Sequence, residues 1–377
     1  MKRFFTKYWW LAYPITLVFL ILTYWLIGKI QYRLNVMDIE EYEPKSVLKV
    51  EEHHPTKAKF PFIDVHNHQF TMPVQDLDKL VKEMDELNMA VMVNLSGFRG
   101  KFLEWSLENV NENYPDRFVL FMNIDFEKID DKNWPDETLA MMEMAVSYGV
   151  KGLKVYKSLG LTDRDSEGNR IKVDDERLDP IWSKCGELGI PVLIHSGEPS
   201  PFWLPKDKYN ERWLELKQYP SRYKDPKKNP TFEEIMAEQH NVFRKHRNTI
   251  FIDAHLGWYG NDLKKMGGIL DEMPSVYTEL GAVLAELGRQ PRSARKWMIK
   301  YQDRVMMGKD IYDKEEYYTY FRVLETYDEY FDYYRKRHAH WKMYGLGLPD
   351  SVLKKVYFQN AYNVIPGIDS SLSHLTF

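Results

Sequence analysis

The chain has 377 residues, which is enough for one large domain or two small ones. An apolar fraction of 44% and a charged fraction of 29% are ordinary for a soluble globular fold, and a net charge of −4 gives no reason to expect nucleic acid as a partner. The single cysteine, Cys185, excludes an intrachain disulfide and a lipid anchor near the N-terminus.

The first feature along the chain is an apolar segment at residues 8–28 that carries no charge and is long enough to cross a bilayer as a helix. Aromatic residues lie near both of its ends, as is usual at membrane interfaces. We expect a transmembrane anchor, with a cleaved signal peptide and a buried core helix as alternatives. The basic residues within 1–7 favour a cytoplasmic N-terminus and a main domain outside the cytoplasm. Residues 29–58 are expected to form a charged juxtamembrane linker.

From residue 59 onward, apolar runs of strand length alternate with longer amphipathic stretches. The expected strands are 60–66, 90–96, 118–124, 150–156, 190–195, 249–254, 275–279 and 303–308. Eight strand–helix units predict an α/β fold, a (β/α)8 TIM barrel, over residues 59–370. A doubly wound open sheet is the runner-up, but no GxGxxG motif follows the first strand.

Two segments between or after these strands need a separate interpretation. Residues 197–248 form a long connection rich in Pro, Trp, Tyr and charge, which is either a lid over the site or a solvated helical excursion. The aromatic stripe between Tyr317 and Tyr334 has helical spacing and predicts a helix packed on the barrel rather than a ligand site.

Histidines and an aspartate stand where four of the apolar runs end. His66 and His68 are two apart, so on a strand both side chains project to the same face. His195, His255 and Asp310 end three later runs. Because the C-terminal ends of barrel strands meet on one face, we expect these side chains to converge on a metal ion.

The ordered set of motifs resembles the amidohydrolase superfamily, in the amidohydrolase-related branch that includes metal-dependent hydrolases and decarboxylases of the aminocarboxymuconate-semialdehyde type. The matching pieces are FIDVHNH at 62–68, GVKGLKVYKSLGL at 149–161, GIPVLIHSGEP at 189–199, FIDAHLGW at 251–258, VYTELGAVLAELGRQP at 276–291, RVMMGKD at 304–310 and YFQNAYNVIPG at 357–367. The resemblance covers roughly residues 59–368.

The resemblance implies roles for the five strand-end residues. His66, His68, His195 and Asp310 match metal ligands, and Asp310 also handles protons. His255 matches a residue that is a second ligand or a catalytic group, depending on the member. The resemblance implies one divalent ion, with zinc the common choice.

Two lysines near the site are also of interest. Lys309 is a departure from the family, because the residue before the strand-eight aspartate is usually Ser or Thr. Lys154 ends the fourth strand, where some superfamily members carry a carbamylated lysine that bridges two metals. A positioned ammonium or a packed lysine is the interpretation we prefer for Lys154.

A divalent ion with an open position can supply hydroxide at neutral pH. Our first hypothesis is therefore hydrolysis, in which water on the metal attacks an amide, ester or lactone of a small organic substrate. In this scheme Asp310 accepts the proton, and His255 donates to the oxyanion if it is not a ligand. The alternatives are non-oxidative decarboxylation on the same metal, and an inactive membrane-tethered binding protein. Whether the chain forms a homo-oligomer is left open.

Other polar residues cluster near the predicted strand ends. The candidates for substrate contact are Lys154, Tyr156, Glu198, Glu279, Arg289 and Lys309. For each one, a structural ion pair is an equally good interpretation. Asp64 and Asp253 precede site histidines by two residues, so they are expected either to orient imidazoles or to cap strand ends.

Overall fold

The computed structural model describes residues 9–368, with side chains from residue 13, and divides the chain into two units, Met1–Val50 and Glu51–Phe377. The first unit contains helix α2 (Trp9–Leu34), which includes Pro14 near its start. A stretch of this helix, Tyr13–Leu34, has a mean hydropathy of 1.6 and is long and apolar enough to cross a membrane. Its position and composition fit a membrane anchor or a signal sequence.

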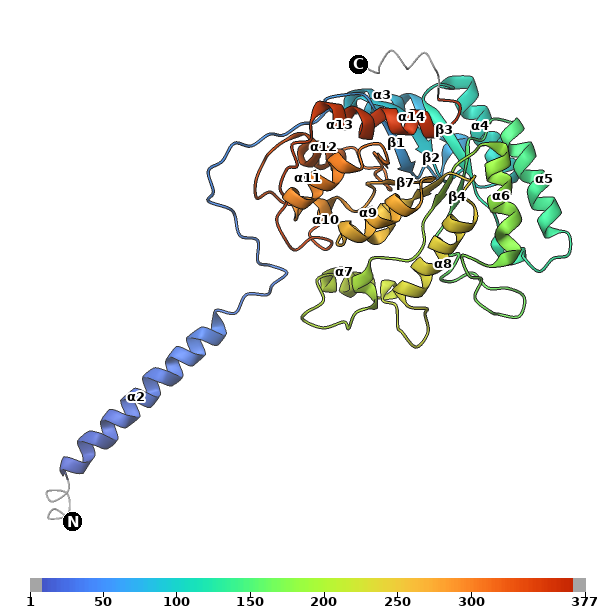
Figure 1. Cartoon of the computed structure of the whole chain (residues 1–377). Helices are drawn as coiled ribbons and strands as arrows, with labels where there is room; N and C mark the ends of the chain where they lie inside the picture. Colours follow the sequence, from blue (N-terminus) through green and yellow to red (C-terminus); the bar gives the residue numbers. More distant parts are fainter. Residues whose placement is uncertain (1–8, 369–377) are drawn as a thin grey trace. The chain divides into compact units, whose positions relative to one another are not determined.

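The second unit is built around eight parallel strands in the order β1 to β8 (Figure 1). They are β1 (Phe62–Asn67), β2 (Met89–Asn94), β3 (Phe118–Met122), β4 (Gly152–Val155), β5 (Val192–Ile194), β6 (Phe251–Asp253), β7 (Val276–Glu279) and β8 (Val305–Met306). A parallel bridge between Asn67 and Asp310, and a bond of 2.9 Å from Val65 N to Met307 O, return the last strand to the first. The predicted TIM barrel is confirmed, and its eight strands coincide with the eight expected apolar runs.

The helices surround the barrel strands (Figure 1). They are α3 (Leu77–Leu87), α4 (Gly100–Asn113), α5 (Trp134–Ser147), α6 (Asp179–Leu188), α7 (Trp213–Gln218), α8 (Phe232–Lys245), α9 (Leu263–Glu272), α10 (Leu284–Gly288), α11 (Pro291–Lys300), α12 (Glu316–Glu325), α13 (Asp350–Lys354) and α14 (Asn360–Val364). Short turns of 3-10 helix are η1 (Met72–Val74), η2 (Phe126–Lys128), η3 (Glu176–Leu178), η4 (Ser200–Trp203), η5 (Pro220–Arg222) and η6 (Ala254–Trp258), and η7 (Lys355–Gln359) is a π-helical turn.

Two apolar clusters explain how the barrel is filled. The inner cluster joins alternate residues of six strands, among them Val65, Val93, Phe121, Leu193 and Ile252. The larger outer cluster packs the opposite faces of the strands against the helices. Alternation of the two faces follows from the period of two along a strand, and it leaves the strand ends free to carry polar groups.

Helix α3 illustrates how the sequence sets an element's limits. The Asp76 side chain accepts hydrogen bonds from the first-turn amides and caps the N-terminus, and Asn88 ends the helix in the left-handed conformation, with φ 68°. Between them the predicted stripe Leu77, Leu80, Val81, Met84 and Leu87 is buried. The resulting helix is one complete amphipathic element of the outer layer.

The long connection and the aromatic stripe, which needed a separate interpretation from the sequence, have the following structures. The connection at 197–248 contains η4, α7 and η5, followed by α8, whose N-terminus has a capping box made by Thr231 and Glu234.

The helix expected over the aromatic stripe is α12, but it ends at Glu325, so the prediction is wrong beyond that point. There Thr326 is extended and its carbonyl accepts a bond of 2.7 Å from Gly347 N. The aromatic residues that follow have strand-like preferences, which competed with the helical spacing.

Candidate metal centre

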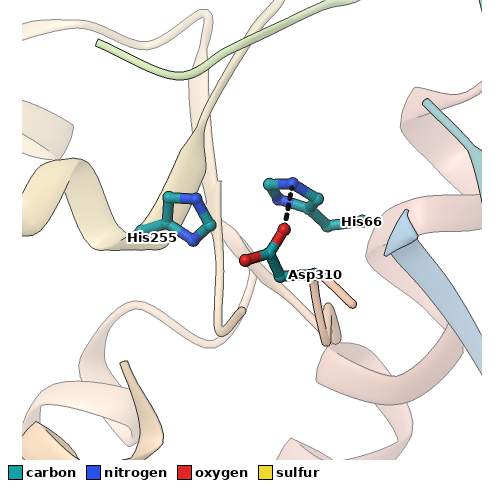
Figure 2. Close-up of side chains that lie close together, drawn as sticks. All are labelled: His66, His255 and Asp310. Atoms are coloured by element: carbon teal, nitrogen blue, oxygen red, sulfur yellow. Dashed lines mark ion pairs between the residues drawn. The ribbon is translucent and has the colours of Figure 1, made fainter. Parts of the chain in front are cut away.

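The five strand-end residues that the sequence suggested lie together at the C-terminal end of the barrel. Asp310 Oδ1 is 3.5 Å from His66 Nε2 and 3.6 Å from His68 Nε2. The ring centroid of His255 lies 4.8 Å from that of His66 and 4.4 Å from that of His195. Figure 2 shows the carboxylate of Asp310 directed between the rings of His66 and His255. Strands β1, β5, β6 and β8 therefore each supply part of one cluster.

Glu279 at the end of β7 fixes the ring of His66. Its Oε1 accepts hydrogen bonds from His66 Nδ1 at 3.0 Å and from the backbone N of His255 at 2.6 Å. Its Oε2 accepts from Gly281 N. Because a carboxylate can only accept, His66 carries its proton on Nδ1 and directs the lone pair of Nε2 toward Asp310. Glu279 has no exposed surface.

A chain of hydroxyls fixes His68 in the same way. The Tyr156 hydroxyl donates to Leu95 O at 3.2 Å, so its oxygen accepts from Ser96 Oγ at 3.1 Å. The Ser96 oxygen is then the acceptor for His68 Nδ1 at 2.7 Å. His68 therefore also keeps its proton on Nδ1 and presents Nε2 as a lone pair.

The remaining two histidines set one another's tautomer. His255 Nδ1 donates to Gly281 O at 2.7 Å, which leaves Nε2 of neutral His255 as an acceptor. His195 Nδ1 lies 3.3 Å from that nitrogen and must donate to it. Nε2 of His195 is then a buried lone pair without a hydrogen-bond partner among the described residues. His195 thus offers the site a free nitrogen, whereas Nε2 of His255 is already engaged.

Backbone conformation at the strand ends is unusual and contributes to this geometry. Five non-glycine residues that closely follow β6, β7 and β8 have positive φ: His255 (60°), Leu256 (53°), Trp258 (58°), Ala282 (57°) and Asp310 (87°). This region is costly for residues with a Cβ and persists where the surrounding structure enforces it, which is common at functional sites.

Burial keeps the histidines in the neutral form that can bind a metal. Desolvation, with a contribution from Lys154, holds the pKa values of His66 and His195 well below the ordinary value and lowers that of His68 to about 4. Burial would raise the pKa of Asp310, but the neighbouring imidazoles and Lys154 lower it to about 2. At neutral pH the cluster is three neutral lone-pair donors around a carboxylate.

The sequence matches the amidohydrolase family over residues 52–366. The chain belongs to the amidohydrolase family. No curated protein matches it significantly.

Solved structures similar to this amidohydrolase share its barrel. They include 2,6-dihydroxybenzoate decarboxylase from Rhizobium, at 14% identity and a TM-score of 0.52, covering 81% of this chain and 98% of that one. A dihydroxybenzoic acid decarboxylase from Polaromonas sp. JS666, with bound manganese and 2-nitroresorcinol, has 14% identity and a TM-score of 0.52. The match covers 81% of this chain and 96% of that one. A TIM-barrel protein from Bordetella bronchiseptica has 15% identity and a TM-score of 0.50, and the match covers 81% of this chain and 98% of that one. These likenesses show the fold.

Amidohydrolase family members bind a divalent metal, and the His/His/Asp group of this chain fits one. Two ligands at about 2.1 Å from a tetrahedral ion lie about 3.4 Å apart, close to the separations between Asp310 and the two β1 histidines. Nε2 of His66 and Nε2 of His195 are buried without hydrogen-bond partners within residues 13–368. His66, His255 and Asp310 also have ligand atoms within 4.8 Å of one another. We favour His195 over His255 as the third nitrogen ligand, because only His195 has a free lone pair.

The residues proposed for substrate contact have diverse partners in this amidohydrolase. Glu198 is buried and binds Lys157 Nζ at 2.7 Å. Arg289 pairs with Glu211 at 2.8 Å and with Glu286. Lys309 Nζ is held by Glu316 and by Ile311 O.

The contacts of the substrate-contact candidates therefore favour structural ion pairs for Arg289 and Lys309, and positioning roles for Glu279 and Tyr156. Lys154 differs from all of these. It is 1% exposed, and its Nζ has no hydrogen-bond partner among the described residues.

The two aspartates that precede site histidines cap and join elements instead of orienting imidazoles. Asp64 accepts from the backbone N atoms of His66 and Lys309 and from the Tyr317 hydroxyl. Asp253 turns to the other face of its strand and accepts from Gln239 Nε2 of α8 at 2.9 Å.

Sequence reasoning missed Ser96, and it also missed Trp258, which stacks on His255 with centroids 4.5 Å apart. Ser96 follows the second apolar run as the histidines follow theirs, so the same pattern could have identified it.

Proposed function

We propose that this amidohydrolase is a metal-dependent hydrolase that cleaves an amide, ester or lactone of a small organic substrate, using one divalent ion, zinc, held by His66, His68, His195 and Asp310. The observation that carries the proposal is the convergence of free imidazole lone pairs on a carboxylate that remains 28% exposed. A divalent ion there would polarise the scissile carbonyl and lower the pKa of water from about 15.7 to about 7.

Asp310 would carry the proton steps, and His255 would hold a metal ligand in place. Asp310 would accept the proton of the attacking water and return it to the leaving group, because its carboxylate is ionised at neutral pH and accessible. Nε2 of His255 accepts from His195 Nδ1, so His255 would keep His195 in the tautomer that leaves Nε2 free, instead of donating to the oxyanion.

Metal content and turnover together test these roles. In the purified full chain, His66→Ala and Asp310→Ala should abolish turnover of a panel of N-acyl compounds, esters and lactones without loss of far-UV circular dichroism. His195→Ala should lose metal, whereas His255→Ala should still bind metal, but about 10- to 100-fold more weakly, because the partner behind His195 is removed. Unchanged rates in the first two variants would remove these residues from the mechanism, and metal retained by His195→Ala would assign the ligand role to His255.

The same panel distinguishes the alternatives. Hydroxybenzoates are included because a carboxy-lyase would release CO₂ from them with no acid or amine product. Protein that holds well under one equivalent of any divalent ion, and turns over nothing, would support an inactive binding protein.

We propose that residues 8–28 anchor the protein in a membrane, with residues 1–7 in the cytoplasm, 29–58 as a linker and the barrel, 59–370, on the outer side. The support is the single apolar helix α2 and the basic residues that precede it. Protease added to intact cells should remove the barrel. A mature N-terminus beginning after residue 28 would instead indicate a signal peptide.

A further inference from the structure

The amine of Lys154 is a strongly polar group at the site that the hydrolytic scheme above does not use. Lys154 lies on β4, paired with Leu193 of β5 in the register of the inner face. Its Nζ is 5.5 Å from the ring of Tyr156, and that ring stacks on His68 with centroids 5.7 Å apart. The charge of Lys154 also contributes to the lowered pKa values of His66, His68 and His195.

The fold itself makes no use of this amine. Nζ is buried, and no acceptor within the described part of the chain reaches it, although buried polar groups are nearly always hydrogen-bonded. Burial lowers the pKa of Lys154 to about 7 against the opposing effect of Asp310 and Glu279. An unpaired buried amine costs stability, so a structural lysine at this position would have a partner.

The charge balance around Lys154 points to the kind of acceptor that is missing. Lys157 is paired with Glu198 at 2.7 Å, so its charge is already balanced. Asp310 is expected to be neutralised by the metal, which would leave Lys154 without an available carboxylate at the floor of the site, and a cation in that position suits an anion.

We propose that Lys154 Nζ binds an anionic oxygen of the substrate, so that the natural substrate carries a carboxylate close to the bond that is cleaved. The inference rests on the proposed function and specifies its substrate class. The carboxylate supplies the acceptor that Nζ lacks, and this contact would place the scissile carbonyl beside Asp310.

Equilibrium binding of a matched pair of probes, benzoate and benzamide, tests the proposal without requiring turnover. The zinc-loaded full chain in detergent micelles is titrated by calorimetry, with intrinsic tryptophan fluorescence as a second signal. The wild type should bind benzoate about 10- to 100-fold more tightly than benzamide, the range of one hydrogen bond to a charged group. Lys154→Met should remove this preference and leave benzamide binding unchanged.

Lys157→Met is the matched control, because it removes the same charge from the same region but its amine already has Glu198 as a partner. It should keep the preference for benzoate. Lys154→Met should also keep its zinc and not lower the thermal midpoint, since the fold loses no hydrogen bond of this amine.

Several results would overturn the proposal. They are equal affinity of the wild type for the two probes, no binding of benzoate, an equal loss in the Lys154 and Lys157 variants, or loss of zinc from Lys154→Met. A carbamate on Lys154, seen by carbon-13 NMR with labelled bicarbonate, would also overturn it. If the preference for benzoate holds while the hydrolase panel shows no turnover, the reaction class fails and the anion site stands.

Discussion

Replacing Glu279 by glutamine is the sharpest test of how this amidohydrolase prepares its metal site. Glu279 contacts no open part of the site, yet its two oxygens accept from His66 Nδ1, His255 N and Gly281 N. Glutamine has nearly the same shape but replaces one acceptor oxygen with a donor. One of the three hydrogen bonds must therefore become a contact between two donors.

The size of the effect follows from the two orientations of the amide. With its oxygen toward His66 and His255, the new NH₂ group faces Gly281 N, and the unsatisfied buried donors cost about 1–3 kcal/mol of folding free energy. With its NH₂ toward His66, that ring must move its proton to Nε2 and lose its lone pair. The first orientation should dominate because it keeps the lone pair of His66. It replaces the carboxylate behind His66 with a neutral amide, which supports the basicity of the ring less, so metal affinity should fall by about 10- to 100-fold.

Competition against a chromophoric chelator measures the zinc affinity, and urea unfolding of metal-free protein measures stability. Glu238→Gln is the control, since Glu238 is a buried carboxylate that binds Arg170 through both oxygens, with no contact to the five site residues. It should lower stability and leave zinc affinity unchanged. If Glu279→Gln binds zinc within about twofold of the wild type, the negative charge of Glu279 does not prepare His66 for the metal and this reasoning is refuted.

Four further predictions use other parts of the structure. Burial raises the pKa of Asp253 to about 8, so the native state holds an extra proton above the unfolded pKa of about 3.9, and stability should fall as pH rises between these values. Asp253→Asn should flatten that dependence in urea unfolding at about pH 5 and about pH 8. A Cβ at Gly308 would lie 2.2 Å from Glu279 Oε2, so Gly308→Ala should weaken zinc binding in the chelator assay although it alters no ligand. Tyr156→Phe breaks the hydroxyl chain and should weaken zinc binding about 10-fold in the same assay, with far-UV circular dichroism unchanged. A chain without residues 1–50 should remain in the supernatant after ultracentrifugation without detergent, whereas the full chain should sediment with membranes.

The fold was predictable because the barrel repeats one simple pattern. Each strand is a short apolar run buried on both faces, as in β3 (Phe118–Met122), and each helix has a stripe such as that of α3. The pattern failed after Glu325, where aromatic residues at helical spacing are held in an extended path by backbone bonds between Thr326 and Gly347. Contacts between residues far apart in the chain decide that conformation, and the spacing of aromatic residues in the sequence does not reveal such contacts.

In the candidate site, only the strand-end histidines and Asp310 stood out clearly in the sequence. Histidines at strand ends stand out because an apolar run rarely ends in one by chance. The groups that prepare them do not stand out, because a backbone carbonyl such as that of Gly281 has no sequence signature at all. Glu279 and Tyr156 were noticed as polar residues near strand ends. Their role depends on which ring nitrogen they face, and this is known only once the barrel brings β2, β4 and β7 close to β1 and β6.

Lys309 shows how this chain tolerates a cation beside the aspartate of its site. A lysine next to Asp310 in sequence could neutralise the carboxylate and compete with a metal. The left-handed backbone of Asp310 instead sends the two side chains apart, with Asp310 toward the histidines and Lys309 toward Glu316 and Ile311 O. Arg335 binds the same Glu316 at 2.8 Å, so the lysine belongs to a separate ion pair network. The strained φ at Asp310 thus separates two opposite charges that the sequence places side by side, and it leaves the carboxylate directed toward the histidines.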